Sequence, residues 1–272
     1  MAFEVPTKNV MTKEKPNKHS KINKIIAIMS GKGGVGKSSV TALTAVALRD
    51  NGYNVGILDA DITGPSIPKI FGLGGKKSTY SEMGIKPMES TLKGIKVISI
   101  NLLLEDEEAP VIWRAPLITQ TIKQFFTEVE WGELDYLLID LPPGTGDVPL
   151  TIMQSIPLNG ILIVSSPQDL VRLIVKKSVN MSNTMKVPVL GLVENMSYFK
   201  CPDNGKKYNI FGEGKVKSAA EEMGLELLGK LPIDPELSKL SDDGKIEEYT
   251  DINEEFNEIF GNKIVETIGG LK

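Results

Sequence analysis

Short, fully apolar runs alternate with longer amphipathic stretches along most of the chain. Runs such as Ile25–Met29 lie between polar turns and are typical of strands that a sheet buries on both faces. The stretches between the runs are long enough for crossover helices, and Ser39–Arg49, rich in alanine and leucine, has a helical composition. This alternation predicts a mainly parallel sheet. The other predicted strands are Val55–Asp59, a short one at Ile85–Met88, Ile95–Ile100, Tyr136–Asp140, Gly160–Val164, Val189–Val193 and Leu225–Leu231, and the other predicted helices are Leu117–Val129, about 169–185 and Glu213–Met223.

No internal repeat and no domain boundary interrupts this pattern. We therefore expect one doubly wound α/β domain over residues 24–272, with helices on both faces of the sheet and a ligand at the carboxyl ends of the strands. Residues 1–23 are polar and rich in lysine, so we expect a disordered basic arm. A solvated tail and a contact with an anionic partner are both open for this arm. His19 lies among its lysines and is expected to be a surface residue.

The composition limits the possible chemistry. The 272 residues are 41% hydrophobic and 24% charged, as in ordinary globular domains with a full core. The net charge of −4 gives no reason to expect nucleic-acid binding. One cysteine and one histidine exclude an intrachain disulfide and a Cys/His zinc site from one chain. No apolar run approaches the ~18 residues of a membrane span, and the N-terminus lacks the apolar core of a signal peptide, so we expect a cytoplasmic protein.

A glycine-rich turn joins the first predicted strand to the first predicted helix. The sequence Gly31-Lys32-Gly33-Gly34-Val35-Gly36-Lys37-Ser38 has the G-x-x-x-x-G-K-S spacing of a phosphate-binding loop, or P-loop. Its glycines allow backbone N–H groups to turn toward phosphates at the helix N-terminus. We expect Lys37 to contact the outer phosphates, Ser38 to ligate Mg²⁺, and Ser39 to complete the nucleotide contacts. The sequence therefore predicts a nucleotide-binding P-loop domain.

Acids at the ends of two predicted strands can complete this site. Asp140 follows four apolar residues and would hold the Mg²⁺ water shell or hydrogen-bond the serine of the loop. Asp59 and Asp61 stand at the end of another strand, and either could orient or deprotonate the attacking water. The residues alone give nearly equal support to each acid in this role. The turns that follow, Leu141–Asp147 and Thr63–Pro68, combine proline with glycine and are expected to act as switches that sense the γ-phosphate.

Loops after the late strands supply candidates for binding the nucleotide base. Asn195 follows the predicted strand Val189–Val193 by two positions and offers both a donor and an acceptor to an adenine edge. Pro232 and Asp234 are placed to line the opposite side, although ordinary turn residues would look the same. The guanine-reading sequence Asn-Lys-x-Asp does not occur, so we favour ATP over GTP.

A second lysine in the loop carries a family resemblance. Lys32, directly after the first glycine, gives the deviant form of the loop, which resembles that of the MinD and ParA ATPases and their relatives. Further stretches resemble the Mrp/ApbC branch of iron–sulfur cluster carriers, and together with the loop they span roughly residues 24–245. These stretches are Asp59–Ser66, Ile112–Pro116, Glu130–Tyr136, Asp140–Asp147, Pro167–Asp169 and Val193–Tyr198.

The resemblance implies an ATPase with slow turnover. It implies a homodimer that binds an iron–sulfur cluster at its interface and delivers the cluster to apo-proteins under the control of ATP. It further implies that Lys32 reaches across the interface to phosphates bound by the other subunit. Lys37 and Asp61 are the other catalytic residues that the resemblance favours.

The chain departs from the family pattern at the cluster site. The family places Cys-x-x-Cys directly after Asn-Met-Ser-Tyr, whereas this chain has Cys201-Pro202-Asp203-Asn204 at that place. A dimer would therefore offer two thiolates where a [4Fe–4S] cluster ordinarily takes four. Cluster binding through Cys201 stays open, and Asp203, another chain or a small thiol would have to complete the coordination. A smaller departure is Ala115, where the family usually has glycine.

Two alternative functions are compatible with the same loop. One is a positioning ATPase of the ParA or MinD kind, and the other is a nucleotide-switched regulator without a cluster. Membrane-binding members of the first class end in a basic amphipathic helix. Residues 251–272 instead carry five acids against two lysines, a net charge of −3. We therefore expect neither a membrane nor a nucleic acid as a partner.

Overall fold

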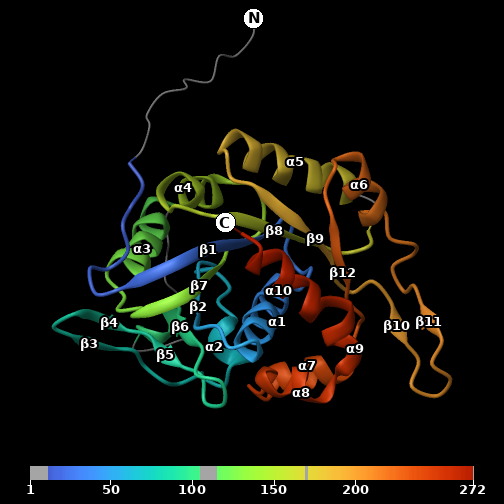
Figure 1. Ribbon diagram of the computed structural model, residues 1–272, viewed down its shortest axis with the longest axis horizontal. Coiled ribbons are helices and arrows are strands. Elements are labelled where there is room, and N and C mark those ends of the chain that lie inside the picture. The colour runs from blue at the N-terminus through green and yellow to red at the C-terminus, as the bar shows by residue number, and fades with distance from the viewer. Residues whose placement is uncertain (1–11, 105–114, 169–170, 272) are drawn as a thin grey trace, which may run out of the picture.

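The computed structural model describes residues 12–104, 115–168 and 171–271. Its central sheet has eight strands, which are β1 (Lys21–Ser30), β2 (Val55–Asp59), β5 (Met88–Glu89), β6 (Lys96–Ile98), β7 (Glu133–Asp140), β8 (Gly160–Ser165), β9 (Val189–Glu194) and β12 (Leu227–Lys230). Their order across the sheet is β12-β9-β8-β1-β7-β2-β6-β5 (Figure 1). Neighbours are parallel except for β5, which pairs antiparallel with β6. The predicted doubly wound, mostly parallel sheet is confirmed.

Helices cover both faces of this sheet (Figure 1). The first face carries α1 (Lys37–Asp50), α2 (Ile67–Ile70) and the C-terminal segments α7 (Pro235–Asp242), α8 (Tyr249–Ile252), α9 (Glu254–Phe256) and α10 (Asn262–Gly269). A 3₁₀ turn at Ile246–Glu248 and a π-helical turn at Asn257–Gly261 join these C-terminal segments. The second face carries α3 (Ala115–Thr127), α4 (Asp147–Ser155), α5 (Val171–Thr184) and α6 (Val216–Glu222).

The central strand β1 shows why its run of apolar residues is continuous. Ile26 and Ile28 belong to the hydrophobic core under α1, whereas Ile25, Ala27 and Met29 belong to the core on the opposite face. All five are buried. Because side chains alternate between the two faces of a strand, a strand covered on both sides must be apolar at every position.

The first residues of the described chain differ from the predicted disordered arm. β1 begins at Lys21, four residues before the predicted strand, and pairs there with β7. Upstream, the Lys13 ammonium donates hydrogen bonds to backbone oxygens of Met153 and Ile156 (2.6 and 3.0 Å). Asn17 is buried. Residues 12–23 are therefore tied to the domain surface by polar contacts with backbone carbonyls, although most of their side chains stay exposed.

The other predicted elements lie close to observed ones. Predicted helices 39–49, 117–129, 169–185 and 213–223 correspond to α1, α3, α5 and α6. The apolar stretch Ile95–Ile100 is strand only over β6 and then tightens into a 3₁₀ turn at Ile100–Leu102. The predicted short strand Ile85–Met88 overlaps β4 (Gly84–Lys86) and β5. We did not predict α2, α4, α7, the strand β3 (Thr79–Ser81) that pairs with β4, or the hairpin of β10 (Phe199–Lys200) with β11 (Lys207–Tyr208). Predictions for residues 1–11, 112–114 and 169 concern positions that lie outside the described residues.

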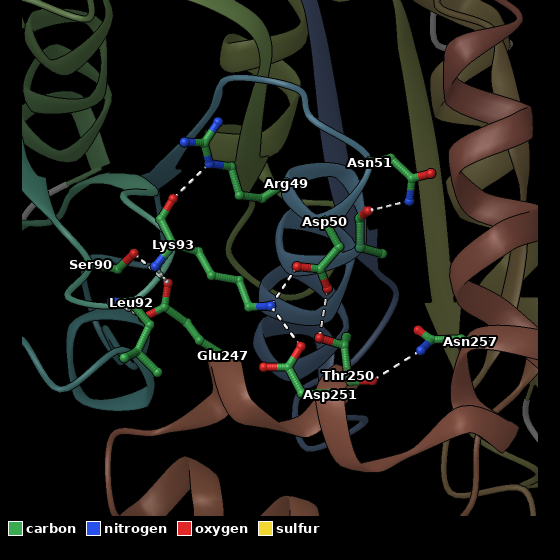
Figure 2. Close-up of polar contacts among 11 residues, drawn as sticks. Arg49, Asp50, Asn51, Ser90, Leu92, Lys93, Glu247, Thr250, Asp251 and Asn257 are labelled. Atoms are coloured by element: carbon green, nitrogen blue, oxygen red, sulfur yellow. Dashed lines mark hydrogen bonds and ion pairs between the residues drawn. The ribbon is translucent and has the colours of Figure 1, made fainter.

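A buried carboxylate fastens the C-terminal segments to the loop between β5 and β6 (Figure 2). Glu247 Oε1 accepts hydrogen bonds from the Ser90 hydroxyl (2.6 Å) and the Lys93 backbone N–H (2.9 Å). Its Oε2 accepts one from the Leu92 N–H (3.2 Å). The Lys93 ammonium also pairs with Asp50, the last residue of α1 (2.5 Å). The C-terminal segments are thus held against the end of α1.

Candidate functional site

The glycine-rich turn lies between the end of β1 and the start of α1, at the carboxyl edge of the sheet. Gly36 caps the helix with φ of 75°, a left-handed conformation that favours glycine. A Cβ there would also lie 2.2 Å from the Asn195 side-chain nitrogen. No side-chain hydrogen bond caps the N-terminus of α1. Its first N–H groups and the helix dipole therefore face the space in front of the loop, as an anion site requires.

Lys37 begins α1 and points into the floor of this space. Its ammonium lies 2.8 Å from Asp140 Oδ2, and the two side chains are 6% and 0% exposed. Among the described residues no acceptor is aligned with its N–H groups for a hydrogen bond. A buried ammonium with unused donors is costly unless another anion satisfies them. This observation fits a phosphate group in front of Lys37.

Asp140 is the centre of a small polar cluster under the loop. Besides Lys37, its carboxylate receives the Ser38 hydroxyl on Oδ2 (2.6 Å) and the Thr41 hydroxyl on Oδ1 (2.6 Å). Hydroxyl and carboxylate oxygens are the ligands that Mg²⁺ prefers. Ser38 and Asp140 could therefore hold a magnesium ion, directly or through water. Thr41 was not among the predicted site residues, although its position four residues after Lys37 puts both on one face of the helix.

The structure separates the two acids at the end of β2. Asp59 is buried and accepts hydrogen bonds from the Asp61 N–H (3.2 Å) and the Ser99 hydroxyl (3.1 Å). Asp61 is half-buried, accepts a hydrogen bond from the Thr63 hydroxyl (3.2 Å) and lines the cavity in front of the loop. The sequence alone did not decide whether Asp59 or Asp61 acts on the attacking water. In the structure, Asp61 is the acid that faces the ligand space.

Both acids are perturbed by their surroundings. Burial, followed by the charge of Asp140, raises the pKa of Asp59 well above its ordinary value, and Lys37 opposes this shift. Burial also raises the pKa of Asp61, against the opposing effect of Lys37. Raised carboxyl pKa values beside a cavity are typical of groups that exchange protons.

Two adjoining cavities extend from the loop. The first, about 250 Å³, is lined by residues 33–39 and by Asp61, Ser66 and Pro143, so both predicted switch segments reach it, whereas Gly31 and Lys32 do not line it. The second, about 260 Å³, shares Gly36 and Ser39 with the first and is lined further by Asn195, Met196, Pro232 and Asp234. The structure therefore brings together the residues predicted for phosphates and those predicted for the base.

Asn195 and Asp234 already have partners within the chain. The Asn195 amide donates a hydrogen bond to the backbone oxygen of Val35 in the loop (3.0 Å). Asp234 caps α7 by accepting the Glu236 N–H (2.9 Å) and accepts the Tyr249 hydroxyl (2.7 Å). Both side chains therefore also hold the walls of the second cavity in place.

Lys32 does not point into the cavities. Its ammonium donates a hydrogen bond to the side-chain oxygen of Gln168, just after β8. Lys32 lies at the outer side of the loop, where the backbone oxygen of the same residue accepts the Ser30 hydroxyl (3.0 Å).

Cys201 lies in the loop that joins β10 to β11. Its thiol is free and partly exposed. The loop is a tight turn, because the Cys201 N–H donates to the Lys206 oxygen (2.9 Å) and the Cys201 oxygen accepts from the Gly205 N–H (2.8 Å). Asn204 accepts the Lys206 N–H (2.9 Å), while Asp203 is exposed. In the part of the chain that the structure describes, no group of three or more His, Cys, Asp or Glu is arranged to hold a metal ion.

Curated relatives match most of the chain at nearly half of the aligned positions. The chain is 48% identical over 249 residues to the iron–sulfur cluster carrier protein of Clostridium perfringens, which covers 89% of this chain and 87% of that protein. It is 49% identical over 256 residues to the protein of the same name from Methanocaldococcus jannaschii, covering 93% and 88%. Across the described residues, no helix is long and apolar enough to cross a membrane.

Solved structures agree with this kinship. A nucleotide-binding protein of Archaeoglobus fulgidus in complex with ADP is 51% identical, with a TM-score of 0.77 over 84% of this chain and 89% of that one. The cell-division ATPase MinD of Pyrococcus furiosus, 20% identical with a TM-score of 0.62 over 92% and 100%, shares the fold. A family model described as ParA, NUBPL iron-transfer P-loop NTPase, matches residues 21–268. The predicted kinship with the iron–sulfur branch of the deviant-loop ATPases is confirmed, and the chain belongs to the NUBPL iron-transfer P-loop NTPase family.

Proposed function

We propose that this chain binds and hydrolyses ATP in order to load iron–sulfur clusters and transfer them to apo-proteins. The observation that carries the proposal is the buried ammonium of Lys37, held by Asp140 under a cavity lined by uncapped helix N–H groups. The names of the relatives from Clostridium and Methanocaldococcus support the cargo, and the ADP in the Archaeoglobus structure supports the nucleotide.

The phosphate loop binds the triphosphate in this proposal. Backbone N–H groups of Gly31–Ser38 surround the phosphates, and Lys37 donates to the outer ones. Ser38 and Asp140 hold Mg²⁺, which when bound neutralises charge on the phosphate oxygens. Ser39, Asn195, Pro232 and Asp234 line the space for adenine.

Asp61 acts on the attacking water. It lies at the cavity with a raised pKa, so its carboxylate can orient the water and accept a proton from it. Asp59 takes a supporting role, because its carboxylate holds the Asp61 backbone N–H and the Ser99 hydroxyl.

Lys32 completes the site across a homodimer. Its place at the outer side of the loop, bonded to Gln168 rather than turned into the cavity, supports a role toward a second subunit. We expect Lys32→Ala to lower the rate of ATP hydrolysis, while the affinity of a single subunit for ATP changes little. Lys86→Ala, on the exposed β3–β4 hairpin, is the matched control. Unaltered hydrolysis by Lys32→Ala would exclude the cross-subunit role.

Cys201 holds the cargo. Its partly exposed thiol on the β10–β11 hairpin is accessible to iron, and two chains supply two thiolates to one cluster. The remaining iron ligands come from Asp203, a small thiol or the receiving protein. The decisive experiment incubates the protein with iron and sulfide without oxygen. We expect about one cluster per dimer in the wild type and none in Cys201→Ser.

The nucleotide part is tested separately. Lys37→Ala is expected to lose ATP binding by calorimetry, since no neighbouring cation replaces the charge on the transferring phosphate. A wild-type protein that stays colourless and free of iron would contradict the carrier function. ATP-dependent co-sedimentation with DNA or lipid would favour a positioning ATPase instead.

A further inference from the structure

Two glycines bring the backbones at the ends of α2 and α7 into direct contact. A Cβ on Gly244 would lie 2.5 Å from the Cα and 2.7 Å from the nitrogen of Gly72, and a Cβ on Gly72 would lie 2.8 Å from the Gly244 oxygen. Figure 1 shows the two helices next to each other. Because neither glycine has a side chain, no rotamer change at this contact can absorb a relative shift of the helices.

Gly244 serves both the end of its own helix and this contact. It follows α7 with φ of 71°, and its N–H donates to the Ser241 oxygen (3.3 Å), while the Lys245 N–H donates to the Leu240 oxygen (2.7 Å). This is a common helix ending with a left-handed residue, and asparagine is also found at that position in other helices. The close approach to Gly72 is the stricter requirement, since it leaves no room for a Cβ of any kind.

The two helices line different cavities of the nucleotide site. Helix α7 starts at the base end, where Asp234 caps it, and its residues Ser238 and Ser241 line the second cavity. Helix α2 lines the first cavity with Ile70 and with Ser66, the residue that precedes the helix. The glycine contact therefore joins the wall of the space for the base to the wall of the space for the phosphates.

The wall on the phosphate side is close in sequence to the acid that acts on water. Five positions separate Asp61 from Ser66. Within them the chain turns back on Asp61, whose backbone oxygen accepts the Gly64 N–H (3.1 Å) and whose carboxylate accepts the Thr63 hydroxyl (3.2 Å). The segment is short and internally bonded, so the place of α2 limits where Asp61 can lie.

We propose that Gly72 and Gly244 are positioning residues for ATP hydrolysis, because their contact makes α2 and α7 one wall of the nucleotide site. A base seated against α7 then fixes the place of α2 and, through it, the place of Asp61 in front of the γ-phosphate. Binding energy from a part of the substrate far from the reacting atoms is thereby used to order a catalytic group. This inference rests on the proposed hydrolysis of ATP.

The test compares ATP with inorganic triphosphate, which fills the space for the phosphates but has no base. We expect the wild type to hydrolyse ATP with a kcat about tenfold above that for triphosphate. In Gly244→Ala the added methyl group pushes the two backbones apart, so kcat for ATP should fall about fivefold, while kcat for triphosphate and the calorimetric Kd of ATP stay within about twofold of the wild type. Gly72→Ala changes the contact from the other side and should show the same selective loss.

Gly224→Ala is the matched control. Gly224 follows α6 with φ of 66°, and the Leu225 N–H donates to the Ala220 oxygen (2.9 Å), so this helix ends in the same way as α7. Among the described residues, a Cβ on Gly224 would meet no atom within 4 Å. The control therefore has the same backbone strain without the contact, and it should hydrolyse ATP like the wild type.

Three results would overturn the proposal. One is a Gly244→Ala protein that loses turnover of ATP and of triphosphate to the same degree, since the glycine would then serve only the fold. Another is an equal loss of ATP turnover in Gly224→Ala. The third is a wild type that hydrolyses both substrates with the same kcat, a comparison that does not depend on how well the variants fold. Failure of the proposed function looks different, because the wild type would then hydrolyse neither substrate.

Discussion

The ammonium of Lys37 and the carboxylate of Asp140 lie 2.8 Å apart beneath the phosphate loop, and both side chains are buried. A buried ion pair is stable only when further hydrogen bonds satisfy its remaining donors and acceptors. The hydroxyls of Ser38 and Thr41 do so for Asp140. These four residues therefore form one hydrogen-bonded unit. A substitution of Thr41, which does not line the cavity, is expected to alter the site by moving Asp140.

Thr41→Val tests this unit. Valine keeps the shape of threonine but removes the hydroxyl that lies 2.6 Å from Asp140. We expect a loss of about 1 to 2 kcal/mol in the free energy of unfolding, because a buried acceptor loses its donor. The affinity for Mg²⁺ with ATP should fall as well, since Asp140 is no longer held in place. Urea denaturation and calorimetry measure the two effects.

Thr41→Ser is the control, because serine restores the hydroxyl. If valine and serine behave alike in both measurements, Thr41 only fills space and has no part in positioning Asp140.

Asp59→Asn is expected to stabilise the protein at neutral and alkaline pH. Burial raises the pKa of Asp59 well above its ordinary value, so the folded state disfavours the charged form. Its contribution to stability is present at low pH and is lost as the pH rises through the folded-state pKa. An asparagine keeps an acceptor for the Asp61 N–H and avoids this loss. We expect a gain on the order of 1 kcal/mol at pH 8.

The gain should shrink as the pH is lowered toward 4, where wild-type Asp59 is protonated. Denaturation at several pH values measures the trend, with Asp203→Asn, an exposed acid, as the reference. A gain that is equal at all pH values would contradict the assigned protonation.

Asp61→Asn should separate hydrolysis from binding. The amide keeps the size of the side chain but cannot accept the proton of the water, so we expect turnover to fall about 100-fold. ATP affinity should stay nearly constant, because Lys37 and the loop are intact. Phosphate release and calorimetry provide the two readouts. Normal turnover would mean that another residue activates the water.

Glu247→Gln should loosen the C-terminal segments. The wild-type carboxylate accepts three hydrogen bonds, from Ser90, Leu92 and Lys93, whereas an amide has only one acceptor oxygen (Figure 2). Bonds to a buried charge contribute about 1.5 to 3 kcal/mol each, so a loss of about 2 kcal/mol is expected. Hydrogen exchange should show the loss first in the C-terminal segments. Glu254→Gln, which is not buried, is the control.

The arrangement of the sheet could be predicted because the central strands are buried on both faces. Strands such as Ile25–Met29 must then be apolar throughout, and the acids that end β2 and β7 mark their carboxyl ends. The phosphate loop was predictable for a similar reason, since its backbone conformation needs glycine at Gly36.

Other features depend on contacts that a local pattern does not contain. The sequence alone supported Asp59 and Asp61 equally as the acid that acts on water. Only the fold shows that Asp59 is bonded to Ser99 and that Asp61 lies at the cavity. The strands of the β10–β11 hairpin are too short to have a period. The contacts of Lys13 and Asn17 could not be predicted, because the backbone oxygens that they bond lie far away in the sequence.

The bond from Asn195 to the loop has a mechanical consequence. Six positions separate Asn195 from Cys201, and the main chain between them is pinned where the Ser197 N–H donates to the Leu231 oxygen (2.8 Å). A shift of Val35 upon nucleotide exchange would act first on the Asn195 side chain, at the start of the segment that carries the thiol. We therefore expect the rate at which an alkylating reagent modifies Cys201 to differ between the ATP-bound, the ADP-bound and the nucleotide-free protein.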